Sequence, residues 1–332
     1  MAIISGHHLF CNAEKYKRLL VARRRCLPIV QHYYSSGYPK YFRYAERMLN
    51  CSPELNLRIF TDITLEGVST KISIENARWC HVRQCAMCQL AKASKQRAIL
   101  FKAFANLDLT QKSYAFLTLT HRNRPLNELR DSLSEMTRAW NKLAQRRTFP
   151  VTGFLRSMEV TMQKQRMPKD KKKNTGLPVR APDGQLMSHP HFHVLLEMEP
   201  GYFDNIKKTE WWVKEWQSAL GCDYGPTVYI RKIRPGSDGD FNKAILETVK
   251  YTVKPDDFGN GEHSAEWLYG ITEQLHGLRS LAVGGSIAKL CSQKSLDKIQ
   301  DTGNDDNEEF QSGRLLKLTW DDTANIWKVT DC

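Results

Sequence analysis

The sequence predicts an α+β protein: an antiparallel sheet with flanking helices, preceded by a basic N-terminal region that carries cysteines and followed by a small C-terminal extension. Three segments predict the sheet, over residues 116–120, 157–162 and 189–196. In each, polar and apolar side chains alternate as they do in a strand with one buried face. We expect helices to cover one face of this sheet and to leave the other face free for a site.

The remaining elements follow from periodicity and from turn residues. Apolar side chains at helical spacing predict helices, and short apolar runs after Gly-Pro or Gly-Asn segments predict strands. The expected elements are helices over residues 129–143, 212–220, about 240–254 and 267–283, a strand over 229–233 and a terminal hairpin over 314–331, which follows an acidic linker over 301–309.

Two histidines lie two positions apart on the strand predicted over residues 189–196. Side chains two apart on a strand point to the same face, so His191 and His193 project together while Phe192 and Val194 face a core. Paired imidazoles on a strand are typical of a metal site. The alternative is two polar residues on a solvated sheet face.

A third ligand is expected to supply oxygen, because Mg²⁺ and Mn²⁺ prefer hard oxygen ligands beside imidazoles. Glu159 lies on the polar face of the strand that precedes the histidine strand, and we predict it as this ligand. His189 is the alternative, since it shares the parity of His191 and His193. The intervening Pro190 weakens that alternative, because proline is typical of a strand's first residue or edge.

The helix predicted over residues 240–254 carries a carboxylate, a phenol and an ammonium group. At about 100° per residue, Glu247, Tyr251 and Lys254 fall on one side of it. This trio suits phosphodiester transfer, with Tyr251 as nucleophile, Lys254 favouring the phenolate or binding phosphate, and Glu247 as a base for a second nucleophile. A solvated helix face is the alternative.

These segments resemble, in order, the three motifs of rolling-circle plasmid replication initiators of the HUH endonuclease superfamily, in the branch with one catalytic tyrosine and a nearby glutamate. Residues 116–120 resemble the first motif, 189–196 the second and 247–254 the third, and the resemblance covers about residues 77–290. In relaxases of the same superfamily the tyrosine precedes the histidine pair. Here it follows that pair, as in initiators and related transposases.

The resemblance implies a mechanism and partners. Tyr251 would attack a phosphate at the plasmid's double-strand origin, giving a 5′-phosphotyrosyl enzyme and a free 3′-OH. A glutamate at the position of Glu247 would activate water for the final cleavage. The implied partners are plasmid origin DNA, double- and single-stranded, together with a host helicase and polymerase.

Charge agrees with a nucleic-acid partner, since the formal net charge is +13. Basic residues gather between positions 164 and 180, where Asp170 is the single acid and proline and glycine interrupt regular structure. We predict that this loop holds the DNA backbone, and a merely solvated hairpin tip is the alternative. The predicted contacts are Lys164, Arg166, Lys169, Lys171, Lys172, Lys173 and Arg180.

Residues 15–47 interleave basic side chains with six tyrosines. This mixture suits phosphate contact combined with base stacking. A helical packing layer whose tyrosines form a core explains it equally well.

The sequence has nine cysteines but no signal-peptide core and no apolar run of about 18 residues, so we expect a cytoplasmic protein with reduced thiols and no membrane partner. Cys80, Cys85 and Cys88 have spacing typical of a zinc knuckle, and the family has a similar cluster before its first motif. Buried free thiols are the alternative. A fourth ligand could be Cys51, His81 or His121.

We divide the chain into an N-terminal DNA-binding region (1–108), a nicking domain (109–258) and a C-terminal region (259–332). Three other functions are compatible with parts of the pattern. A tyrosine transposase would share the chemistry, a hydrolytic metalloenzyme would leave Tyr251 idle, and a non-catalytic zinc and DNA-binding regulator of copy number would need only the cysteines and the charge.

Overall fold

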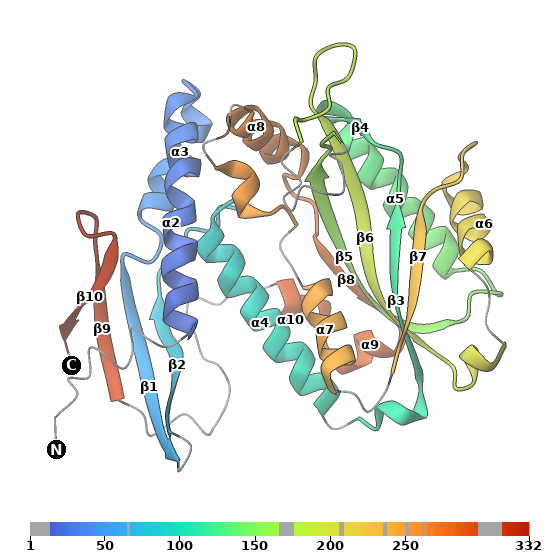
Figure 1. Ribbon diagram of the computed structural model, residues 1–332, viewed down its shortest axis with the longest axis horizontal. Coiled ribbons are helices and arrows are strands. Elements are labelled where there is room, and N and C mark those ends of the chain that lie inside the picture. The colour runs from blue at the N-terminus through green and yellow to red at the C-terminus, as the bar shows by residue number, and fades with distance from the viewer. Residues whose placement is uncertain are drawn as a thin grey trace. The chain divides into compact units, whose positions relative to one another are not determined.

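Antiparallel pairing organises the sheets of this protein, which Figure 1 shows as a computed structural model. The structure describes residues 14–64, 67–105, 107–165, 176–205, 209–234, 238–249, 252–259, 261, 263–297 and 314–331.

The helices and strands in these ranges alternate along the chain. The helices are α2 (Glu14–Ser35), α3 (Pro39–Leu49), α4 (Ala86–Ala105), α5 (Leu129–Ala144), α6 (Thr209–Leu220), α7 (Asp238–Thr248), α8 (Ser264–Gln274), α9 (Gly285–Leu290) and α10 (Gln293–Asp297), with short 3-10 turns η1 (Leu109–Gln111), η2 (Leu126–Glu128), η3 (Tyr202–Asn205) and η4 (Pro255–Phe258). The strands are β1 (Glu54–Thr64), β2 (Gly67–Ala77), β3 (Ser113–Thr120), β4 (Arg124–Pro125), β5 (Val151–Met162), β6 (Met187–Met198), β7 (Val228–Ile233), β8 (Leu281–Gly284), β9 (Arg314–Asp321) and β10 (Ile326–Asp331).

The chain forms two compact units. One comprises residues 1–95, 258–260 and 298–332, and the other comprises residues 96–257 and 261–297. The C-terminal hairpin therefore belongs to the same unit as the N-terminal helices. The functional division at residues 108 and 258 stays a prediction.

The first unit is built on a sheet of strand order β10-β9-β1-β2. The predicted terminal hairpin is present as β9 and β10, and β9 pairs with β1 from Glu54 opposite Thr319 onward. Trp327 on β10 is 1 % exposed, and its indole nitrogen donates to the Ser52 carbonyl oxygen at 3.2 Å. The Tyr16 hydroxyl on α2 donates to the Trp327 carbonyl oxygen at 3.3 Å. Helix and sheet thus share one core.

The second unit contains the predicted sheet, in the order β7-β3-β6-β5-β8 with β4 paired to β6 among the described strands. The α+β class is confirmed, as are β3, β5, β6 and β7. One face carries Phe192 and Val194, both fully buried. Helix α5 lies on this face, where the Trp140 ring packs edge-on against Phe154 at 5.0 Å between ring centroids.

The opposite face of this sheet, which we expected to be open, is covered by helices over part of its length. Helices α4 and α7 cover one end of it, because Leu100, Phe241 and Ile245 form a single buried cluster with Phe116 and Leu195 of the sheet. Burial of such side chains stabilises each by about 1.5–3 kcal/mol relative to exposure. Along β3 and β6, apolar residues under these helices therefore give way to polar ones at the uncovered end.

Helix α7 is shorter than predicted. We expected it to reach residue 254, but it ends at Thr248. The β-branched Thr248 and Val249 and the approach to Pro255 disfavour further helical turns. The chain instead runs beside β5, where the Val160 backbone N–H donates to the Thr252 carbonyl oxygen at 2.8 Å.

A strand also replaces part of the helix predicted over residues 267–283. Helix α8 ends at Gln274, Gly277 adopts a φ of +71°, and β8 then pairs with β5 from Phe154 to Ser157. The unpaired edge of β5 needs hydrogen-bond partners, and this requirement overrides local helix preference. Of the helices in the described ranges, none is long and apolar enough to cross a membrane.

Candidate active site and cysteine centre

The uncovered end of the sheet carries two rows of polar side chains. Residues directly opposite each other on neighbouring strands share a face. Thr118 lies opposite His193, and Thr120 lies opposite His191, which in turn lies opposite Glu159. The strand register therefore brings the two histidines and the predicted carboxylate to one place.

Three ligand atoms converge there. The Oε2 atom of Glu159 lies 2.8 Å from Nε2 of His193 and 3.2 Å from Nε2 of His191. One donor atom from each residue lies within 4.8 Å of the others. Two imidazole nitrogens and one carboxylate oxygen at this spacing fit a divalent cation.

Other groups fix which histidine nitrogens face inward. Nδ1 of His191 donates to the His189 carbonyl oxygen at 3.4 Å, and Nδ1 of His193 lies 3.2 Å from Oγ1 of Thr118. The Phe116 ring stacks on His193 with 5.5 Å between ring centroids. Hydrogen bonding at Nδ1 leaves Nε2 available as a ligand, so Thr118 of the first motif supports the second.

Glu159 is ionised in this setting. Burial opposes its ionisation, but hydrogen bonds and charge from His191 and His193 outweigh burial and hold the pKa of the Glu159 carboxyl well below its usual range. A metal ligand must be deprotonated, so the carboxylate is ready to bind a cation.

His189 lies outside the converging group. Its ring centroid is 5.2 Å from that of His191, and its Nδ1 lies 2.6 Å from Oδ1 of Asn123. Burial, followed by the charge of His191, lowers the pKa of His189. The geometry thus favours Glu159 over His189 as the third ligand.

The third motif is only partly described, and Tyr251 lies outside the described residues. The carbonyl oxygen of its neighbour Thr252 accepts a hydrogen bond from the backbone N–H of Val160, the residue after Glu159, so Thr252 lies beside the strand that carries Glu159. Glu247 is half-buried in the last turn of α7, and Lys254 is exposed beyond the helix. The predicted common helix face for Glu247 and Lys254 is therefore wrong.

Asp257 is a nearby acid that the sequence analysis missed. Burial raises the pKa of its carboxyl, Lys164 and Lys254 oppose this, and Glu159 adds to it. Asp257 therefore shares its electrostatic environment with Glu159 and both lysines. The signal in the sequence was the acidic pair that directly follows Pro255.

The predicted DNA-binding loop is described only at its two ends. Lys164 is exposed and forms an isolated antiparallel β-bridge with Pro178, so the loop begins as an extension of β5. Arg180 donates to both carboxylate oxygens of Glu266, at 3.0 and 2.8 Å, so its charge is already partly matched. The remaining predicted contacts lie outside the described residues: Arg166, Lys169, Lys171, Lys172 and Lys173.

Four buried cysteines form a second candidate metal centre, in the first unit. Cys51 joins the three predicted ligands, with its Sγ 3.7 Å from Cys88 and 3.6 Å from Cys85. Cys80 and Cys88 are 3.5 Å apart between sulfurs. A tetrahedral zinc with Zn–S bonds of about 2.3 Å holds its sulfurs about 3.8 Å apart, so the four thiols fit zinc.

The other proposed fourth ligands do not join the cysteine group. His121 lies beside α5, with Nδ1 3.0 Å from the Ser132 hydroxyl and Nε2 3.3 Å from the Glu135 carboxylate. His81 is not among the residues whose ligand atoms converge. A fifth thiol, Cys26, lies 3.7 Å from Cys85 and was not anticipated from spacing.

Comparisons with known proteins find a family and several relatives. The family described as "Replication protein" matches residues 71–326, well over half of the chain. A "Protein rep" of Streptococcus pneumoniae is 28 % identical over 275 residues, covering 78 % of each chain. A "Protein rep" of Lactiplantibacillus plantarum is 26 % identical over 302 residues, covering 84 % of this chain and 86 % of that one. A "Replication protein" of Staphylococcus aureus is 30 % identical over 221 residues, covering 62 % and 86 %. No solved structure matches the chain.

Proposed function

Because the chain belongs to the Rep family of rolling-circle plasmid replication initiators, we propose that it cuts and rejoins one DNA strand at its plasmid's double-strand origin. The observation that carries this proposal is the convergence of Glu159, His191 and His193, with Thr252 hydrogen-bonded to the residue that follows Glu159. Origin DNA, first double-stranded and then single-stranded, is the proposed partner.

Glu159, His191 and His193 would hold a Mg²⁺ or Mn²⁺ ion. Such an ion, when bound, polarises the scissile phosphate. The chain's own contribution is to orient these ligands, through Thr118 and the His189 carbonyl, and to hold Glu159 ionised.

Tyr251 is the proposed nucleophile. Its phenolic oxygen forms a bond to phosphorus, the bond from phosphorus to the 3′-oxygen breaks, and the departing 3′-oxygen takes up a proton. A phenol has a reference pKa of about 10, so a nearby positive charge such as the Lys254 ammonium is needed for it to react as phenolate near neutral pH. The 5′-phosphotyrosyl end keeps the bond energy for later rejoining.

The third metal ligand can be identified by metal titration. We expect Glu159→Gln to raise the Mn²⁺ concentration needed for half-maximal nicking by about 10-fold or more, because an anionic ligand is replaced by a neutral amide. Calorimetric titration of Mn²⁺ into the protein without DNA measures the same loss of metal affinity and does not depend on activity. His189→Ala is the matched comparison and is expected to bind Mn²⁺ nearly as wild type does.

The supporting role of Thr118 is measured in the same titration. Thr118→Val removes only the hydroxyl beside His193 and should weaken Mn²⁺ binding less than Glu159→Gln does. Wild-type binding by Glu159→Gln together with a loss in His189→Ala would transfer the ligand role to His189.

Glu247 is proposed to activate water for the terminal cleavage. Glu247→Ala should nick at close to the normal initial rate, because the nucleophile and the metal ligands are unchanged. It should then fail to stop after one circle and yield multimeric single strands, seen on denaturing agarose gels. Loss of initial nicking as complete as in a nucleophile variant would instead make Glu247 a metal ligand or the base for Tyr251.

The cysteine centre is proposed to bind structural zinc through Cys51, Cys80, Cys85 and Cys88. All four thiols are buried, and four protein ligands leave no open position for substrate. Zinc here would tie the loop before α4 to the start of β1.

A further inference from the structure

The turn between α2 and α3 carries aromatic rings that the core leaves uncovered. Tyr38 is 66 % exposed and Phe42 is 50 % exposed. By contrast, Tyr33 and Tyr41 are buried and stack at 5.3 Å between ring centroids. The two explanations for the N-terminal tyrosines therefore apply to different residues. Some tyrosines form a core, while the rings at the turn form a surface, and exposed rings gathered at one turn mark an interaction site.

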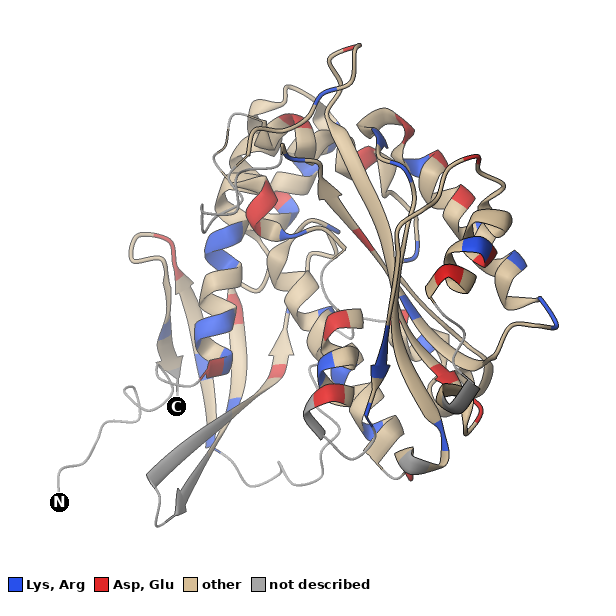
Figure 2. Ribbon diagram, turned by 45° about the vertical axis from the view of Figure 1, so that its right-hand side comes forward, with Lys and Arg blue, Asp and Glu red and all other residues tan. Residues whose placement is uncertain are grey.

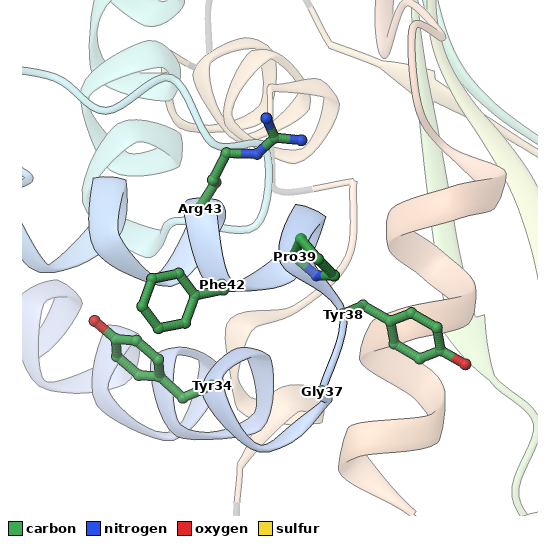
Figure 3. A pocket seen from close by; sticks show the side chains of 6 residues that line it. All are labelled: Tyr34, Gly37, Tyr38, Pro39, Phe42 and Arg43. Carbon is green, nitrogen blue, oxygen red and sulfur yellow. The ribbon is translucent and has the colours of Figure 1, made fainter.

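These rings line an open pocket of about 510 Å³ in the first unit (Figure 3). In Figure 3 the rings of Tyr34 and Phe42 lie together on one side of the turn, and the Tyr38 ring points to its other side. Gly37 makes the turn with a φ of +73°, in the left-handed region that glycine adopts without strain. The complete lining is Tyr34, Gly37, Tyr38, Pro39, Phe42 and Arg43.

Two of the rings are held in place before any ligand arrives. Tyr34 packs edge-on against Phe42 at 5.1 Å between ring centroids. The Tyr34 hydroxyl donates to the Glu46 carboxylate, and this bond, with burial, raises the pKa of Tyr34 to about 12. The phenol stays neutral at physiological pH, and its fixed orientation lowers the entropy lost on binding.

Two cations of α3, Lys40 and Arg43, lie at or next to the rings, whereas the Lys and Arg residues of α2 lie in its first half, at positions 15–25. Helix α2 carries six Lys and Arg residues and α3 carries three, against the acids Glu14 and Glu46. Figure 2 shows blue segments along α2. Arg23 is buried and donates to backbone carbonyl oxygens at the end of α3, so it is structural. Arg43 is exposed at the pocket, and the Lys40 ammonium lies 5.9 Å from the centroid of the Tyr41 ring.

We propose that this aromatic–basic patch, formed by Tyr34, Tyr38, Lys40, Phe42 and Arg43, binds single-stranded DNA. Unpaired bases stack on Tyr38 and Phe42, and the backbone phosphates contact Lys40 and Arg43. Duplex DNA hides its base faces and cannot stack in this way. An apolar protein segment would cover the rings but offer no anion to Arg43, so charge complementarity favours the polyanion.

The patch deepens the proposed function, since a strand-displacing initiator works on exposed single strands, but its binding requires neither the metal ligands nor Tyr251. The test is fluorescence anisotropy of the full chain with a labelled thirty-nucleotide oligo-dT, without added divalent ions. Tyr38→Ala and Phe42→Ala are each expected to weaken binding by about 5- to 150-fold. Tyr38→Phe keeps the ring and is the matched control, expected to bind as wild type does.

Charge and specificity are tested on the same oligonucleotide. Arg43→Gln should reduce the slope of log affinity against log salt by about 0.7, which is the value for one phosphate contact on a single strand. Oligo-dT binding is measured without divalent ions and without nicking, so a failed nicking mechanism leaves this test readable.

Two results would overturn the proposal. One is wild-type affinity for oligo-dT in the Tyr38→Ala/Phe42→Ala double variant with an unchanged melting temperature. The other is a fall in the oligomeric mass of that variant, measured by light scattering, with DNA binding retained, which would make the patch a contact between copies of the chain.

Discussion

Tyr251→Phe is expected to abolish the covalent protein–DNA adduct and to lower the nicking rate at least about 1,000-fold, because it removes only the attacking oxygen. The assay incubates the protein with a single-stranded origin oligonucleotide and Mn²⁺ and follows the adduct on denaturing gels. Origin affinity, measured without added metal, should remain close to wild type because the aromatic ring is retained.

Tyr229→Phe is the matched control for the nucleophile. Tyr229 on β7 lies opposite Thr118, in the same row of the sheet as His193, and is 58 % exposed. We expect Tyr229→Phe to form adduct normally. If adduct disappears in Tyr229→Phe and persists in Tyr251→Phe, then β7 carries the nucleophile and the third motif does not.

Cys51→Ser is expected to lower the zinc content and to destabilise the first unit strongly. Structural zinc contributes about 10–16 kcal/mol of apparent binding free energy in small peptides, which is comparable to the free energy of unfolding of a whole domain. Calorimetry should then show the first unit melting well below the second, and elemental analysis should show less than one zinc per chain.

Two other cysteine variants separate zinc loss from general thiol loss. Cys222 is half-buried and lies outside the cluster, so the Cys222→Ser variant should keep its zinc and its stability. Cys26→Ser should also retain zinc, because Cys26 contacts Cys85 but does not join the four converging thiols. Full zinc content in Cys51→Ser with a loss in Cys26→Ser would make Cys26 the fourth ligand.

Local periodicity was enough to predict the elements that build the candidate site. A strand with one buried face must alternate, so residues 116–120, 157–162 and 189–196 were identifiable, and with them the shared face of His191 and His193. Glu159 could be predicted as a third ligand because it lies on the polar face of the strand that precedes the histidine strand. The strand register that brings it within 2.8 Å of His193 is a property of the folded sheet.

Features that depend on tertiary contacts were beyond the sequence. Helical spacing continued to Lys254, but α7 ends at Thr248 and Thr252 is hydrogen-bonded to β5 instead. Cys51 lies far upstream of the other three cysteines, so spacing alone could not choose it over His81 or His121. The electrostatic influence of Glu159 on Asp257 likewise arises from the folded chain after Pro255.

The pairing of β9 with β1 has a consequence for the order in which the protein folds. The Tyr16 hydroxyl and the Trp327 carbonyl are separated by 311 positions along the chain, yet they bond within one core. The second unit uses nearly contiguous sequence, so it can fold on the ribosome while β1 still has an open edge. The first unit must wait until residues 314–331 emerge, and closing so long a loop is slow. During translation, the sheet of the first unit is therefore completed last, although β1 and β2 are made early.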